Sequence, residues 1–205
     1  LIGRLHDDFE RDVRTKKPGR IIWGAYYIDC YILESSTEPT EYPTWTSNEI
    51  SIYAPYPFWI QDLNIELPKG DSASSGFLDF PYDYAYDYTA PVMGQKIIPS
   101  TFPFESEFRM VIYGEAVNPR IVVNGYAYVL NLTVPAGSYV VIDSRAKTIM
   151  MYGQTGQQTN VFDYRNKSDS VFQKMPAGNL NIAWDSSYGV DLTIYRERSE
   201  PRIAE

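Results

Sequence analysis

Histidine and cysteine are almost missing from this sequence, since His6 and Cys30 are the single examples among 205 residues. One histidine cannot build a three-histidine metal site, and it gives Ser-His or Cys-His catalysis little to work with. A lone cysteine also excludes an intrachain disulfide. Because Cys30 lies inside an apolar run, we expect a buried, unreactive thiol. We therefore expect no cofactor, no bound metal and no catalytic residues.

Long apolar runs are absent too. No stretch approaches the roughly 18 consecutive apolar residues that a membrane helix needs, and no secretory signal opens the chain. The net charge of −8 argues against a general role in binding nucleic-acid phosphates. We therefore expect protein partners, rather than nucleic acid or a membrane.

Motifs of enzyme chemistry are missing as well. The sequence has no phosphate loop, no HExxH motif and no nucleophile elbow. Its 26 acidic residues could still supply the two opposed carboxylates of a glycosidase, such as a cell-wall hydrolase. That enzyme is one alternative; the prediction is that the chain is not an enzyme.

A helical pattern occurs only at the start of the chain. Apolar residues spaced three and four apart predict an amphipathic helix over 1–15, ended by Pro18-Gly19. The following run, 20–34, is apolar at both odd and even positions, which predicts one long strand covered on both faces. We expect one face to pack inside its domain and the other to meet a neighbouring subunit. The candidate subunit-interface residues are Trp23, Tyr26, Tyr27 and Tyr31.

Tyrosine is plentiful, with 18 residues. It is common both at protein interfaces and in strands, so composition leaves both interpretations open. In the segment FLDFPYDYAYDY at 77–88, Asp79, Asp83 and Asp87 recur every fourth residue. An EF-hand calcium loop instead places oxygens at every second position and closes with Glu. We predict an extended arm that contacts a partner through Phe80, Tyr82, Tyr84, Tyr86 and Tyr88.

Alternating apolar residues dominate the chain after residue 108. Asn124-Gly125 separates the apolar runs 121–123 and 126–134, and this pair is the strongest short-range hairpin signal. Further alternation predicts strands at 138–142, 148–152, 179–184 and 190–196. Successive antiparallel hairpins of this length predict a β-sandwich or barrel. Trp184 shares its parity with buried-type neighbours, so we expect it to point into the core.

Several segments together resemble the siphophage distal tail proteins of Gram-positive phages and prophages. They are PYPFW at 55–59, YDYAYDY at 82–88, NPRIVVNGYAYVLNLTVPAGSYVVIDSRAKTI at 118–149, NVFDYRNKSDSVFQKMPAGNLNIAW at 160–184 and VDLTIYRERSEPR at 190–202. The order and spacing of these segments carry the resemblance, which covers essentially the whole chain.

The resemblance implies a mainly β protein, with part of a ring-forming belt domain followed by a galectin-like antiparallel β-sandwich. The expected parts are the belt at 1–57, a connecting arm rich in Pro and Tyr at 58–100, the sandwich at 101–196 and a tail at 197–205. Since the chain starts at Leu1, we expect it to lack the beginning of the belt.

The implied function is structural, in the tail tip or baseplate of a virion assembled in a bacterial cytoplasm. Such a protein forms a hexameric ring between the tail tube and the tail hub, and its sandwich offers a docking platform to a receptor-binding protein. Galectin-like sandwiches elsewhere bind sugars, so a carbohydrate-binding module is the main alternative. A sugar site would need an exposed aromatic platform flanked by polar side chains on one sheet face.

Overall fold

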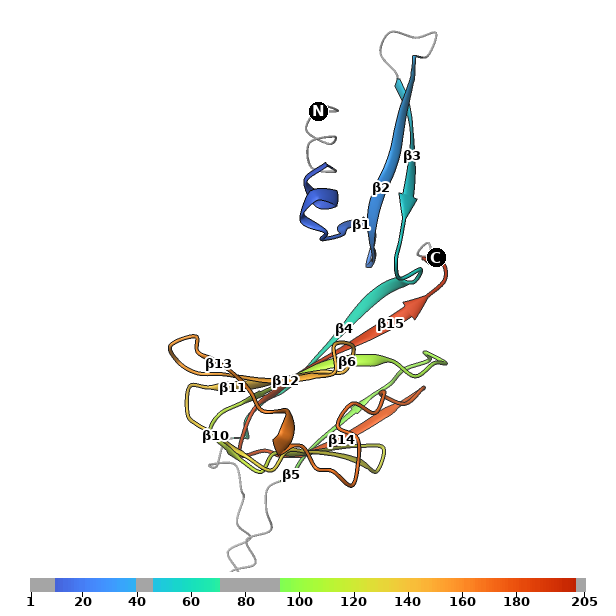
Figure 1. Cartoon of the computed structure of the whole chain (residues 1–205). Helices are drawn as coiled ribbons and strands as arrows, with labels where there is room; N and C mark the ends of the chain where they lie inside the picture. Colours follow the sequence, from blue (N-terminus) through green and yellow to red (C-terminus); the bar gives the residue numbers. More distant parts are fainter. Residues whose placement is uncertain (1–9, 40–45, 71–92, 202–205) are drawn as a thin grey trace, which may run out of the picture. The chain divides into compact units, whose positions relative to one another are not determined.

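The structure, a computed structural model, describes residues 10–39, 46–70 and 93–201 (Figure 1). The chain divides into two compact units. Residues 1–62 and 197–205 form the first, here called the hairpin unit, and residues 63–196 form the second, the sandwich unit. The chain leaves the hairpin unit within β4 (Trp59–Leu67) and returns to it within β15 (Val190–Arg198).

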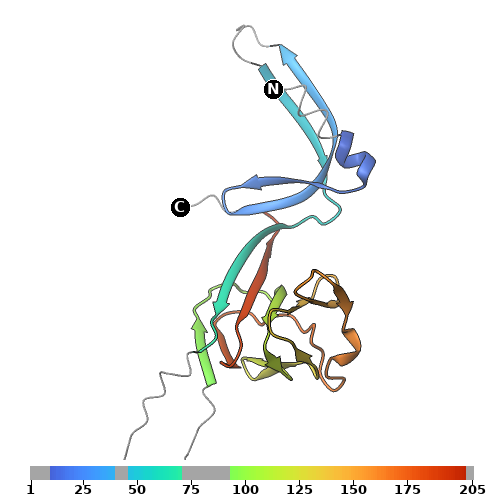
Figure 2. The ribbon, with the colours of Figure 1, turned by 90° about the vertical axis from the view of Figure 1, so that its left-hand side faces the viewer.

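The hairpin unit starts with a short helix at residues 10–15. The predicted helix over 1–15 is therefore confirmed over 10–15, and its first nine positions lie outside the described residues. Three antiparallel strands follow: β1 (Gly19–Trp23), β2 (Tyr26–Pro39) and β3 (Thr46–Tyr53). Figure 2 shows β2 and β3, in two shades of blue, as long paired strands.

The prediction of one long strand over 20–34 is wrong, because the chain turns back on itself after Trp23. Gly24 has φ 59°, a left-handed conformation that glycine adopts without a Cβ clash. The residues on each side, Trp23 and Tyr26, are good strand formers and pair directly across the turn. The apolar run therefore concealed a hairpin.

The sandwich unit consists of two antiparallel sheets. The first has the order β4-β15-β6-β11-β12-β13 and the second β5-β14-β8-β9, while β7 and β10 pair separately. The prediction of a mainly β chain with an antiparallel β-sandwich is confirmed. The bounds are β5 (Met93–Ile98), β6 (Glu107–Tyr113), β7 (Ala116–Val117), β8 (Arg120–Val123), β9 (Tyr126–Val129), β10 (Thr133–Val134), β11 (Tyr139–Asp143), β12 (Thr148–Tyr152), β13 (Gln158–Asn160), the 3-10 turn η1 (Phe162–Tyr164) and β14 (Leu180–Asp185).

Both ends of the connecting arm predicted at 58–100 are strands of the structure, β4 and β5. The prediction is wrong there because the flanking prolines masked a strand pattern. In β4, Ile65 and Leu67 are buried while Asn64 and Glu66 are exposed, which is the period of a half-buried strand. Residues 71–92 of the predicted arm lie outside the described residues.

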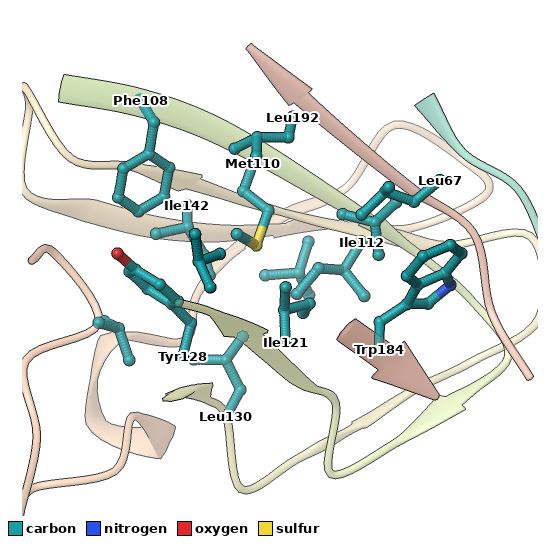
Figure 3. Packing of buried hydrophobic residues seen from close by; sticks show 14 of the residues in the cluster. Leu67, Phe108, Met110, Ile112, Ile121, Tyr128, Leu130, Ile142, Trp184 and Leu192 are labelled. Atoms are coloured by element: carbon teal, nitrogen blue, oxygen red, sulfur yellow. The ribbon is translucent and has the colours of Figure 1, made fainter. Parts of the chain in front are cut away.

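The core lies between the two sheets of the sandwich unit (Figure 3). Phe108 and Met110 project from β6 and meet residues of the second sheet, and Phe108 packs edge-to-face on Tyr128 with ring centroids 5.4 Å apart. Each such side chain contributes about 1.5–3 kcal/mol when fully buried. Trp184 is 5% exposed, so its predicted position in the core is confirmed.

The Asn124-Gly125 turn confirms the predicted hairpin between β8 and β9. Both residues have positive φ, 49° and 87°, as a two-residue hairpin turn requires. Asn124 also ties the turn to β14, because its side chain accepts a hydrogen bond from the Asn181 amide (2.7 Å) and donates one to the Asn179 carbonyl (2.9 Å). The asparagine thus fixes the position of the turn as well as its conformation.

Candidate interaction surfaces

Exposed apolar side chains are concentrated in the hairpin unit. The described part of the chain has fourteen large ones on its surface, and nine of them belong to this unit although it is the smaller. Clusters of exposed apolar groups mark interaction sites. The nine are Val13, Ile22, Trp23, Leu33, Ile50, Ile52, Tyr53, Tyr56 and Phe58.

The four candidate interface residues of this unit divide between two faces of the sheet. Trp23 lies opposite Tyr26, and Tyr27 opposite Ile22. Directly opposed residues share a face, and successive residues alternate. Trp23 and Tyr26 therefore lie on one face, called the inner face, while Tyr27 and Tyr31 lie on the other, the outer face. The four residues do not form one patch.

The inner face is partly filled by the unit itself. Tyr26, Ile28 and Cys30 are buried, whereas Trp23 at the end of β1 remains 56% exposed. Burial, followed by the nearby carboxylates of Asp29 and Asp12, raises the pKa of the Cys30 thiol. The thiol is therefore buried as predicted, and at neutral pH it holds its proton, the unreactive form.

On the outer face, a polar network holds Tyr27. The Arg20 guanidinium lies over the Tyr27 ring, 3.8 Å from its centroid, and donates a hydrogen bond of 2.8 Å to Asp29. This bond is the main cause that raises the pKa of Arg20. The Tyr27 hydroxyl donates to Asp62 at 2.9 Å. Tyr27 is thus half-buried and engaged within its own unit, while Tyr31 is the less constrained of the pair.

The PYPFW segment adds an aromatic pair to the hairpin unit. The rings of Tyr56 and Phe58 lie 5.2 Å apart at 53°, and both are partly exposed. The Tyr56 hydroxyl donates to Glu197 at 2.6 Å, which fastens this segment to residues close to the end of the chain. The segment that contributed to the family resemblance thus presents aromatic surface.

Sequence reasoning missed a row of three tyrosines on the sandwich unit. Tyr113, Tyr139 and Tyr152 lie opposite one another on β6, β11 and β12. The rings of Tyr139 and Tyr152 stack at 5.0 Å, and Tyr113 lies 6.2 Å from Tyr139. Val140, next to Tyr139, is fully buried, so the row occupies the sheet face turned away from the core. Only the register of three strands, which the sequence does not give, brings these residues together.

A hydrogen bond with Asp191 anchors one end of this tyrosine row. The Tyr113 hydroxyl donates to the carboxylate at 2.6 Å, and this bond is the largest of the causes that raise the pKa of Tyr113 to about 12. Tyr113 is 41% exposed. The row is therefore a fixed, half-open aromatic feature with a carboxylate at its edge.

Other candidate residues lie beyond the described ranges. These are Phe80, Tyr82, Tyr84, Tyr86 and Tyr88 of the predicted partner-contact arm, and Asp79, Asp83 and Asp87 of the calcium alternative. Within residues 10–39, 46–70 and 93–201, no group of three His, Cys, Asp or Glu side chains could hold a metal ion. No helix in those ranges is long and apolar enough to cross a membrane.

Comparison with known proteins gives similarity at the level of structure. No protein-family model and no curated protein sequence matches the chain. Among solved structures, a chain of the phage P2 baseplate in its activated conformation with Ca shares 15% identity, with a TM-score of 0.58 over 97% of this chain and 74% of that one. The corresponding structure with Sr gives 16% identity, a TM-score of 0.56 and the same coverage.

A further similar structure is the SPP1 Dit protein, described as a paradigm of the hub adsorption apparatus in phages that infect Gram-positive bacteria. It shares 6% identity, with a TM-score of 0.54 over 94% of this chain and 72% of that one. Identities this low carry fold information alone. The chain has the fold of these phage baseplate and distal tail proteins, as the resemblance in its sequence implies.

Proposed function

We propose that this chain is a structural protein of a phage tail tip or baseplate. It would form a ring, hexameric as the family resemblance implies, between the tail tube and the hub. The sandwich unit would act as a docking platform outside the ring. The observation that carries this proposal is a fold likeness covering 97% of the chain with a phage baseplate protein.

The distribution of exposed apolar groups supports a division of labour between the two units. A subunit contact that persists is expected to be large and apolar, and nine of the fourteen exposed large apolar groups among the described residues lie in the hairpin unit. We therefore assign ring formation to the hairpin unit, with Trp23 and Tyr31 as its most accessible predicted interface residues. The sandwich unit, with its own closed core, remains available to receptor-binding or other tail proteins.

In this proposal the belt at 1–57 corresponds to most of the hairpin unit. The sandwich at 101–196 is enlarged by β4 and β5. The partners are further copies of this chain, the tail tube and the hub, and the location is the virion tail tip. The chain needs no cofactor for this role.

Carbohydrate binding remains a second candidate because of the tyrosine row on the sandwich unit. Tyr113, Tyr139 and Tyr152, with Asp191 beside them, provide aromatic rings and a polar group on one sheet face. However, the Tyr139 and Tyr152 rings are stacked on each other, so the faces that a sugar would cover are partly occupied. Trp184, the other large aromatic of this unit's strands, is buried. We therefore favour protein docking.

Co-expression with the other tail-tip proteins tests the proposal. The chain should co-purify with the tube and hub proteins, and it should neither bind a glycan array tightly nor lyse cell walls. Tight glycan binding that is lost in Tyr152→Ala, without any association with tail proteins, would favour the carbohydrate-binding alternative. Cell-wall cleavage by the purified chain would instead favour an enzyme.

A further inference from the structure

Charges are strongly segregated along the hairpin unit. Five basic residues lie within residues 11–20, and the chain then has no Lys or Arg until Lys69. Seven acidic residues occupy this interval. The basic residues are Arg11, Arg14, Lys16, Lys17 and Arg20, and the acidic ones are Asp29, Glu34, Glu38, Glu41, Glu49, Asp62 and Glu66.

Lys16 and Lys17 are the part of the basic block that has no partner. Arg14 pairs with Glu10 at 2.9 Å, and Arg20 pairs with Asp29 at 2.8 Å. Lys16 and Lys17 are exposed and form no ion pair with any described residue. Their backbone amides donate to helix carbonyls at 3.2 Å each, so the turn that carries both ammonium groups has a defined conformation. We call residues 16–17 the basic turn.

Glu34 and Glu49 are the matching unsatisfied acidic pair, on β2 and β3. Glu34 lies opposite Ser51, and Glu49 lies opposite Ser36. This register places the two glutamates on one face, as diagonal neighbours of the same sign, an arrangement that repels. Both are exposed, and neither forms an ion pair with a described residue. Exposed Leu33 and Tyr53 flank them with apolar surface.

We infer that the β2–β3 hairpin of one copy binds the basic turn of the next copy. This inference rests on the proposed ring. The two surfaces carry opposite charge, belong to the same unit and are not paired with each other within it. A contact between two different surfaces of identical subunits repeats head to tail and can close into a ring. The apolar groups would supply affinity, while the charges would set register and assembly rate.

Charge reversal of the full 205-residue chain tests the contact. K16E/K17E and E34K/E49K should each raise the concentration of half-assembly by about tenfold or more at low salt, because like charges then face each other. The matched controls are K69E/K167E and D163K/D169K, which make the same charge changes at exposed sites of the sandwich unit. These controls should assemble like the wild type. Circular dichroism would verify that each variant folds.

Mixing gives the sharper test. The K16E/K17E variant carries glutamates on both surfaces, and the E34K/E49K variant carries lysines on both. An equimolar mixture should therefore recover assembly by alternating the two variants around the ring, as should the chain with all four substitutions. Unchanged assembly of both variants, or no recovery on mixing, would overturn this contact while leaving the ring intact. A wild type that never assembles would contradict the ring itself, and the contact with it.

Discussion

At the scale of single residues, Ser144 joins two strands through a buried hydroxyl. It is 0% exposed; its hydroxyl donates to Glu107 at 2.5 Å and accepts a bond from the Phe108 amide at 2.7 Å. Lys147 and Lys174 approach the same Glu107 carboxylate at 3.6 and 3.5 Å. This serine therefore completes a charged network at the edge of the core.

Ser144→Ala should lower the free energy of unfolding by about 1–3 kcal/mol, since the Phe108 amide and the Glu107 carboxylate both lose a buried partner. Urea denaturation of the full chain measures this change. Ser187→Ala, at an exposed position, is the control and should cost less than about 0.5 kcal/mol. Equal effects of both substitutions would show that the network does not stabilise the fold.

Tyr188 makes stability depend on alkaline pH. It is 2% exposed, its hydroxyl exchanges hydrogen bonds with the Arg120 backbone at 2.9 and 3.0 Å, and burial raises its pKa to about 12. A free tyrosine loses its proton near pH 10. Between about pH 10 and 12 the unfolded chain therefore releases a proton that the folded chain keeps, so stability falls as pH rises.

Tyr188→Phe should make the decline in stability between pH 10 and 12 less steep, measured by denaturation at a series of pH values. At neutral pH the same variant should be less stable than the wild type, because the Arg120 backbone groups lose their partner. Tyr164→Phe, at a 53% exposed position, should leave the slope unchanged. A slope that Tyr188→Phe does not alter would show that Tyr188 is not the titrating group.

At the scale of elements, turns and strands differed in how well they could be predicted. The β8–β9 hairpin was predictable because Asn124 and Gly125 both favour positive φ and separate two alternating runs. The turn at Gly24 was missed because continuous strand-forming residues surround it. Likewise, β4 was missed because prolines flank it, although its alternation was readable. Local chemistry gives an element only when its boundaries carry a distinct signal.

Surfaces were harder to predict than strands. The tyrosine row depends on the register of β6, β11 and β12, which no local pattern specifies. The four aromatics chosen on β1 and β2 were placed on one strand, so the intervening turn divided them between two faces differently from the prediction. The same turn gave Tyr27 a partner, Arg20, through the β1–β2 pairing.

Gly24→Ala tests the importance of the β1–β2 turn. A side chain at φ 59° costs roughly 1–2 kcal/mol, so amide hydrogens of β1 and β2 should exchange faster than in the wild type. Those of the sandwich unit should be unaffected. Gly153→Ala, where φ is not positive and a Cβ would have 3.9 Å of clearance, is the control. Unchanged exchange in β1 would show that the turn tolerates a side chain.

At the scale of the whole molecule, the account assigns assembly to the hairpin unit and docking to the sandwich unit. Tyr31→Arg should dissociate the ring into monomers without unfolding the sandwich, because a charge would enter an apolar contact. Light scattering would report the mass, and near-ultraviolet circular dichroism the core. Tyr27→Arg is a less specific probe, since Tyr27 also bonds Asp62 in its own unit. An unchanged mass for Tyr31→Arg would place Tyr31 outside the interface.

The most direct test of the central claim is the mass of the purified wild-type chain in solution across a range of concentrations, with negative-stain images of the same sample. The account predicts a closed ring whose mass is six times the 23.5 kDa of one chain, and images with a central opening. A single 23.5 kDa species at every concentration, with no ring in the images, would contradict it.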